Sequence, residues 1–331
     1  MKRSLWAGVF LLPLTFGLGC SSKKDGQAEE KTQAPAPAPE SIRGFSENLT
    51  LAQLKNATYR GLEGIAKPVT LSSGSWEGEP LRRGARSRPA VHFLRDFRLL
   101  GDVDGDGADE AVVLLGVSSG GSGDIIHLAV VKRQGSEAVN VATVRLGDRV
   151  QLRAGRVEAK RLVLDLVQAG ADDAMCCPGE LVTRAWEWTG TGLQEVPTTT
   201  PPGRLSMETL AGPEWVLRQW SWDEAAAATP EVTLVYRDGK INGRSGCNRY
   251  FAAVIDGDQP GDLHVGAAAG TRMACPEAVA AVERRFLSLL PGVTKFGFVG
   301  GKLALTYEKD GIIATMLFDR RTSLPRYGSS P

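Results

Sequence analysis

Histidine is scarce in this chain, and neither sign of charge predominates. Only His92, His127 and His264 occur in 331 residues, which leaves little material for a histidine metal site or a histidine general base. The formal net charge is +1, so there is no electrostatic reason to expect a nucleic acid or an acidic partner. Strand-like runs do not alternate with long helical patterns, which argues against a doubly wound nucleotide-binding fold.

The N-terminus lacks an apolar run long enough to span a bilayer comfortably. Lys2 and Arg3 precede an uncharged apolar run over residues 5–18, followed by Gly19-Cys20 and then polar residues. That is the order of an export signal. A small residue before Cys20 resembles the bacterial lipobox, although Gly17 stands where that motif usually has leucine.

The lipobox resemblance implies that residues 1–19 are a cleaved signal peptide and that Cys20 is acylated. Several acyl chains at one cysteine anchor a protein stably in a membrane. Ser21 is typical of lipoproteins sorted to the outer membrane, so we expect a lipid-anchored protein of the cell envelope at that membrane. Plain secretion with cleavage nearby is the alternative.

Three segments are too polar or too rich in proline to bury a core. Residues 20–46 consist mostly of Lys, Glu, Gln, Ala and Pro, which predicts a disordered tether. Residues 197–203 predict a linker between domains, and residues 322–331 a loose tail. The chain therefore divides into a first domain at residues 47–196 and a second at residues 204–321.

The first domain is predicted to be mostly antiparallel β, because short β-branched runs alternate with clusters of Gly, Asp and Ser. A short helix is plausible only at Leu51–Leu54. The strand-like runs cover residues 69–71, 110–115, 125–131, 139–145, 161–167 and 180–188.

An aspartate-rich loop leads directly into one of these runs. Carboxylates at alternate positions converge when the chain curls, and glycine permits the sharp turn. The segment resembles the loop-to-strand calcium motif of integrin-type β-propeller repeats more than an EF-hand, whose twelfth position falls on a valine here. If the loop binds calcium, we expect ligands from the side chains of Asp102, Asp104 and Asp106, the carbonyl of Ala108, and Glu110 closing the site. A solvated turn that only starts a strand is the alternative.

No catalytic residue is expected. The stretch from Gly116 to Gly120 matches the nucleophile-elbow pattern, but a strand-like run follows it where an elbow requires a helix. Neither a triad nor a carboxylate pair with plausible acid and base environments is visible. The sequence therefore predicts a protein that is not an enzyme.

The second domain contains two motifs, SGCNRYF at residues 245–251 and TRMACP at residues 271–276. With the strand-like residues before and after them, they resemble the META domain, which occurs in the heat-shock lipoprotein HslJ and in a kinetoplastid protein linked to virulence and motility. The resemblance implies a fold but no established reaction or ligand. The pattern by itself predicts a curled antiparallel sheet, with hairpin turns at Asp-Gly and Gly-Gly dipeptides. One amphipathic helix between Pro276 and Leu290 is expected to pack on it.

If Cys20 is acylated, four cysteines remain in an oxidising compartment. Cys247 and Cys275 lie in the two motifs, and we predict that they are bonded. Cys176 and Cys177 are adjacent, so two buried thiols and a redox-labile pair both stay open, and a metal site lacks a second pair of ligands.

The motifs also contain the polar residues Asn248, Arg249, Thr271 and Arg272. They are candidates for binding a ligand. The alternative for Asn248 and Thr271 is a structural role, because turns and helix caps favour these residue types.

Together these features predict a mainly β (α+β) protein: a non-enzymatic envelope lipoprotein with a META-like domain, acting in stress tolerance or envelope integrity. Its partners would be the membrane, through Cys20, and an unidentified envelope protein or small ligand, but no nucleic acid. The alternative function is a calcium-dependent binding or adhesion module in the first domain, and calcium is the only cofactor that the sequence suggests.

Overall fold

The computed structural model describes residues 48–80, 82, 87–120, 123–174 and 176–321. The expected signal peptide, Cys20, the whole tether and the tail lie outside these residues. The described residues all belong to one compact unit, residues 46–331. They form three β-sheets in which nearly all pairings are antiparallel, so the predicted mainly β class is confirmed. The division into two domains stays a prediction.

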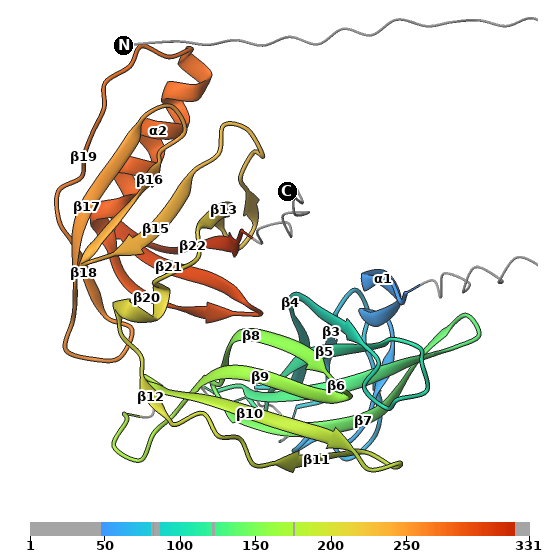
Figure 1. Ribbon diagram of the computed structural model, residues 1–331. Helices are drawn as coiled ribbons and strands as arrows, with labels where there is room; N and C mark the ends of the chain where they lie inside the picture. The colour runs from blue at the N-terminus through green and yellow to red at the C-terminus, as the bar shows by residue number, and fades with distance from the viewer. Residues whose placement is uncertain (1–47, 81, 83–86, 121–122, 175, 322–331) are drawn as a thin grey trace, which may run out of the picture. The chain divides into compact units, whose positions relative to one another are not determined.

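The first sheet has the strand order β2-β1-β7-β6-β5-β4-β3 (Figure 1). Only the β1–β7 pairing within it is parallel. A short helix, α1 (Leu51–Leu54), precedes it. The helix begins with a capping box at Thr50, as expected for a threonine at that position. The strands are β1 (Thr58–Tyr59), β2 (Val69–Thr70), β3 (Ser75–Glu77), β4 (Ala90–Gly101), β5 (Glu110–Ser118), β6 (Ile125–Gln134) and β7 (Glu137–Asp148).

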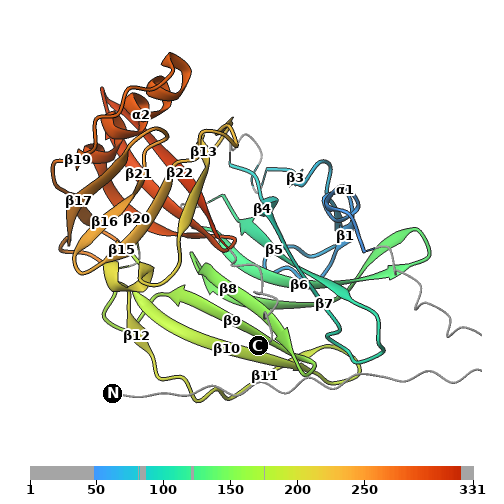
Figure 2. The ribbon, with the colours of Figure 1, turned by 45° about the horizontal axis from the view of Figure 1, so that its top comes forward.

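A second sheet packs on the first through the apolar side chains of both. Figure 2 shows its long strands side by side in the order β11-β10-β9-β8, with β12 also paired to β10. Strand β5 is buried on both faces, because Val113 and Leu115 belong to one apolar cluster, while Val112 and Leu114 belong to the cluster shared with β9. This double burial explains the continuous apolar run in its sequence. The strands are β8 (Gln151–Glu158), β9 (Arg161–Gln168), β10 (Glu180–Trp188), β11 (Leu193–Val196) and β12 (Gly203–Arg204).

The third sheet follows the order β18-β17-β16-β15-β13-β22-β21-β20, with β14 on β13 and β19 on β17. A bridge between Asp262 and Lys295 joins segments beside the two end strands, so the sheet curls as predicted. The 3-10 helix η1 (Met207–Leu210) precedes it. The strands are β13 (Trp215–Ser221), β14 (Glu224–Ala225), β15 (Thr233–Arg237), β16 (Lys240–Arg244), β17 (Arg249–Asp256), β18 (Leu263–Val265), β19 (Ala269–Gly270), β20 (Val293–Val299), β21 (Lys302–Lys309) and β22 (Ile312–Arg320).

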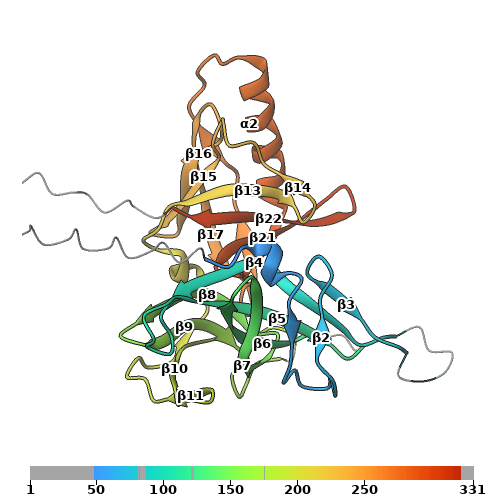
Figure 3. The same cartoon turned by 90° about the vertical axis from the view of Figure 1, so that its right-hand side faces the viewer.

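The predicted amphipathic helix is α2 (Glu277–Leu289), continued by the 3-10 turn η2 (Leu290–Gly292). It lies along one face of the strands β15 and β16 in Figure 3. Phe286 is fully buried, and its ring meets that of Tyr250 edge to face at 5.1 Å. In the described part of the chain, no helix has both the length and the apolar character to cross a membrane.

The predicted hairpin turns also form. Asp238 and Gly239, between β15 and β16, both have positive φ, at 51° and 71°. This is the conformation that a two-residue type I′ turn requires, and glycine adopts it without steric cost.

Candidate functional site

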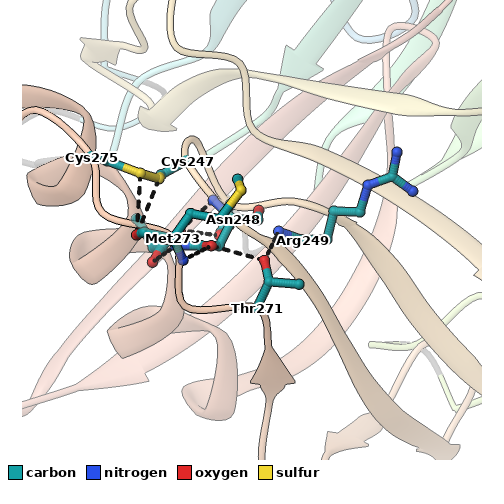
Figure 4. Close-up of a disulfide and its surroundings, with 8 residues drawn as sticks. Cys247, Asn248, Arg249, Thr271, Met273 and Cys275 are labelled. Atoms are coloured by element: carbon teal, nitrogen blue, oxygen red, sulfur yellow. Dashed lines mark hydrogen bonds between the residues drawn. A yellow bond between two sulfur atoms is a disulfide. The ribbon is translucent and has the colours of Figure 1, made fainter.

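The two motif segments lie against each other at the N-terminal end of α2. Ser245 follows β16 directly, Asn248 precedes β17, and Thr271 follows β19. Cys247 and Cys275 are bonded across this junction, with their Cα atoms 6.3 Å apart. Figure 4 shows the bond beside Asn248 and the residues around it.

Asn248 is the hub of the junction. Its Oδ1 accepts hydrogen bonds from Thr271 Oγ1 and from the Met273 amide, both at 2.8 Å. Its Nδ2 donates to Glu283 Oε1 at 3.0 Å, and its backbone amide donates to Glu283 Oε2 at 2.7 Å. The side chain is only 5% exposed, so its hydrogen-bonding capacity is spent inside the protein.

Glu283, on α2, anchors this network to the helix. Its carboxylate also accepts a hydrogen bond from Ser245 Oγ at 2.7 Å. Burial of the carboxyl favours its neutral form, but the hydrogen bonds from Ser245 and Asn248 outweigh burial and hold the pKa of Glu283 below its ordinary value. We call Ser245, Asn248, Thr271 and Glu283 the polar clamp, because they tie both motif segments to α2.

The two arginines of the motifs are placed differently. Arg249 and Arg272 are exposed, and in Figure 4 the Arg249 side chain extends away from the disulfide. Only its backbone is engaged, since the Arg249 amide donates to Thr271 Oγ1. The four predicted binding residues thus separate into two that hold the backbone and two whose guanidinium groups face solvent.

The aspartate-rich loop curls as the sequence suggested. Gly105 and Gly107 have φ values of 82° and 89°, and the Asp102 carboxylate accepts hydrogen bonds from both of their amides. One carboxylate oxygen from each of Asp102, Asp104 and Asp106 then lies within 4.8 Å of the others. Hard oxygen donors gathered in this way suit calcium.

The fourth expected carboxylate, Glu110, holds the start of the loop from the protein interior and is not one of the three that gather within 4.8 Å. Glu110 is 1% exposed, and its Oε2 accepts hydrogen bonds from the amides of Val103 and Asp104. Its Oε1 is buried without a hydrogen-bond partner. Desolvation raises the pKa of Glu110 above its ordinary value. The Ala108 amide donates to Asp106, but among the described contacts none involves the Ala108 carbonyl.

Lys132, on β6, supplies a positive charge to this cluster. Its Nζ donates to Asp104 and, at 2.6 Å, to Asp106, and lies 3.7 Å from Oε1 of Glu110. The hydrogen bonds to Asp104 and Asp106 raise the pKa of Lys132 above its ordinary value. Lys132 thus contacts three of the four carboxylates, and a second ammonium group, that of Lys160, lies 3.5 Å from the Gly105 carbonyl of the same loop.

The structure also records a bond between the adjacent Cys176 and Cys177, with Cα atoms 3.8 Å apart. Cys176 is exposed and Cys177 is half-buried, so the alternative of two buried thiols does not describe them.

Glu283 and Lys132 were not among the residues predicted from the sequence. Glu283 falls four residues after Val279 and three before Phe286, the spacing of one helical face. That spacing was a usable signal. Lys132 carried no such signal, because only the pairing of β5 with β6 brings it to a loop 26 residues away.

The third sheet and its covering helix lie almost wholly within a segment that matches a known family. Residues 208–319 match the family model of the META domain, so the chain contains a META domain. A search of curated proteins found no match. A solved structure described as the NMR structure of the protein from Burkholderia xenovorans is 25% identical and covers 39% of this chain and 99% of its own, with a TM-score of 0.29.

Proposed function

We propose that this protein is a non-enzymatic lipoprotein of the cell envelope, and that its META domain serves stress tolerance or envelope integrity. The observation that carries the proposal is the META domain at residues 208–319, in a chain whose first twenty residues have the order of a lipoprotein signal. The Cys247–Cys275 bond supports a location outside the reducing cytosol, because disulfides persist in oxidising compartments.

The polar side chains at the motifs are hydrogen bonded within the protein, which supports a role without catalysis. Asn248, Glu283 and Ser245 are hydrogen bonded to one another. Groups engaged in this way hold two chain segments in place and are not offered to a substrate. The proposed activity is therefore binding by a rigid surface.

A deletion strain complemented with variants of this protein tests the proposal. We expect the deletion to lower survival of heat or detergent and the wild-type chain to restore it. Cys20→Ser, which removes the acylated thiol, is expected to fail although it folds, whereas Glu277→Ala, on the exposed start of α2, is expected to restore survival. A deletion strain as tolerant as its parent, or full rescue by Cys20→Ser, would contradict the proposal.

A second candidate function, calcium-dependent binding through the first domain, is favoured by one specific observation. Glu110 Oε1 is buried without a hydrogen bond, and the same carboxylate bonds the amide of Asp104, one of three clustered aspartates. Leaving such an oxygen without a hydrogen bond costs free energy, and a divalent cation would make a closer contact than the Lys132 ammonium group does at 3.7 Å. Asp102, Asp104, Asp106 and Glu110 would hold calcium, while Lys132 competes with it for the same oxygens.

Calorimetric titration with calcium chloride tests this candidate on three variants. Asp104→Asn is expected to abolish the binding heat, and Asp109→Asn, an exposed carboxylate of the same loop, to leave it unchanged. Lys132→Met is expected to tighten binding, because it removes the competing ammonium group. Absence of heat at millimolar calcium in both the wild type and Lys132→Met would end the calcium hypothesis.

A further inference from the structure

The cations of the META domain fall into two groups. Those on other elements have partners: Arg218 pairs with Asp319, and Arg285 pairs with Glu224. Among the described residues of this domain, the arginines and the lysine whose side chains have no hydrogen-bond, ion-pair or aromatic partner all fall between residues 237 and 272. They are Arg237, Lys240, Arg244, Arg249 and Arg272.

The strand register places the first four of these cations on one surface. Arg237 is opposite Lys240 across β15 and β16, and Arg244 is opposite Arg249 across β16 and β17. All four are exposed. The residues that alternate with them, such as Ile241 and Tyr250, are buried in the core on the α2 side. The cations therefore occupy the outer face of the sheet.

This arrangement of cations does not stabilise the folded domain. Like charges directly opposite each other on neighbouring strands repel and lower stability. Here the repulsion occurs twice on adjacent strand pairs, while most other cations of the domain have acidic neighbours, as Arg218, Arg285 and Lys302 do. A surface that keeps such repulsion is suited to an anionic partner, which would relieve it.

Large apolar side chains stand among these cations. Phe251 is 52% exposed and Ile255 is 65% exposed, and both point outward from β17. A hollow of about 350 Å³ adjoins Phe251 and is lined by Arg244 and Arg249, and also by Glu214, whose carboxylate is paired with Arg321. We call Arg237, Lys240, Arg244, Arg249, Phe251 and Ile255 the basic face.

We propose that the basic face docks onto an anionic lipid bilayer. Its guanidinium and ammonium groups bind lipid phosphates, and Phe251 and Ile255 enter the boundary between head groups and acyl chains. A single-stranded nucleic acid fits less well, because it needs aromatic platforms for successive bases, and Ile255 offers none. The inference goes beyond the proposed lipid anchor, since the face would contact the membrane without any acyl chain.

Cosedimentation with vesicles tests the inference apart from the anchor. The chain from Ser21 onward lacks the acylated residue but keeps every apolar cluster of the described residues, which are built from residues 49–318, and circular dichroism checks that it folds. We expect it to bind vesicles of phosphatidylglycerol and phosphatidylcholine in equal parts, and not vesicles of phosphatidylcholine alone. Added salt should weaken the binding.

Matched pairs of variants locate the contact. Arg244→Gln with Arg249→Gln is expected to weaken binding by roughly 30-fold, from the usual contribution of two cations near an anionic surface. Arg161→Gln with Arg284→Gln removes the same charge from exposed, paired positions and should change binding far less.

A second matched pair of variants tests the contribution of the apolar side chains to vesicle binding. Phe251→Ser with Ile255→Ser is expected to weaken binding, and Ile312→Ser with Ile313→Ser, which are exposed to similar extents on another hairpin, should not. Equal binding to phosphatidylcholine alone, or equal losses from test and control pairs, would overturn the proposal. So would binding to an oligothymidylate as tight as to the anionic vesicles, with no loss from Phe251→Ser and Ile255→Ser.

Discussion

Arg244 on β16 and Arg249 on β17 stand directly opposite each other, and neither guanidinium group has an acidic partner among the described residues. The pair therefore repels across the strands and costs stability. Because Arg249 belongs to the SGCNRYF motif, part of that motif serves the outer surface of the domain, while its neighbour Asn248 serves the interior.

Replacing Arg249 with Glu turns this repulsive pair into an attractive one. We expect Arg249→Glu to raise the free energy of unfolding by about 0.5 kcal/mol at low salt, and by less at high salt because exposed charges are screened. Urea denaturation measures the effect, with Arg249→Gln expected to fall between the two. Lower stability of Arg249→Glu at low salt would show that the opposed arginines do not repel appreciably.

Removing the carboxylate of Glu283 should break the polar clamp. Glu283→Ala leaves the backbone amide and the side-chain Nδ2 of Asn248 without the Glu283 carboxylate as acceptor, and hydrogen bonds to charged groups are the stronger kind. We expect a loss of about 2–3 kcal/mol in the free energy of unfolding. Glu277→Ala, whose exposed side chain contacts only Arg284, should cost less than about 0.5 kcal/mol. Similar losses from both would mean that the clamp contributes little.

The clamp should also make stability depend on pH. Its hydrogen bonds hold the pKa of Glu283 below the ordinary value of 4.5, so ionised Glu283 stabilises the fold above that pH, and the contribution is lost as the pH falls through the lower, folded-state pKa. Unfolding free energies of the wild type and Glu283→Gln, measured from neutral pH down to about pH 3, should therefore converge. A constant difference over this range would contradict the account.

The disulfide joining the motifs should contribute by limiting the unfolded chain. Cys247 and Cys275 are 28 positions apart, and closing a loop of this size is worth about 3.5 kcal/mol in the chain-entropy description. We expect Cys247→Ala with Cys275→Ala to lose stability of this order. Thiol labelling of the denatured, unreduced protein should leave both wild-type cysteines unmodified, and labelling of all four described cysteines would refute the pairing.

Strands with long apolar runs could be predicted from the sequence, and the run at residues 125–131 lies wholly within β6. Strand β4 was not predicted, because Arg95 and Asp96 interrupt its apolar pattern. Both residues have positive φ, and the β4–β5 register shifts there. A bulge of this kind is stabilised by the neighbouring strand and leaves no clear mark on the local sequence.

The candidate sites were predictable to the extent that their residues are close in sequence. The carboxylates of Asp102, Asp104 and Asp106 converge within one short loop, and alternate spacing was enough to predict that. The clamp joins Asn248 to Glu283 across 35 residues. The basic face depends on which residues of β16 and β17 are opposite each other, and that register is settled by tertiary pairing.

The modification state of Cys20 tests the central claim most directly, because the envelope location rests on it. Mass spectrometry of the protein purified from the membrane fraction should find a chain that begins at Cys20 and carries acyl groups on that residue. A chain in soluble extract that begins at Met1, with an unmodified Cys20, would contradict the lipoprotein assignment.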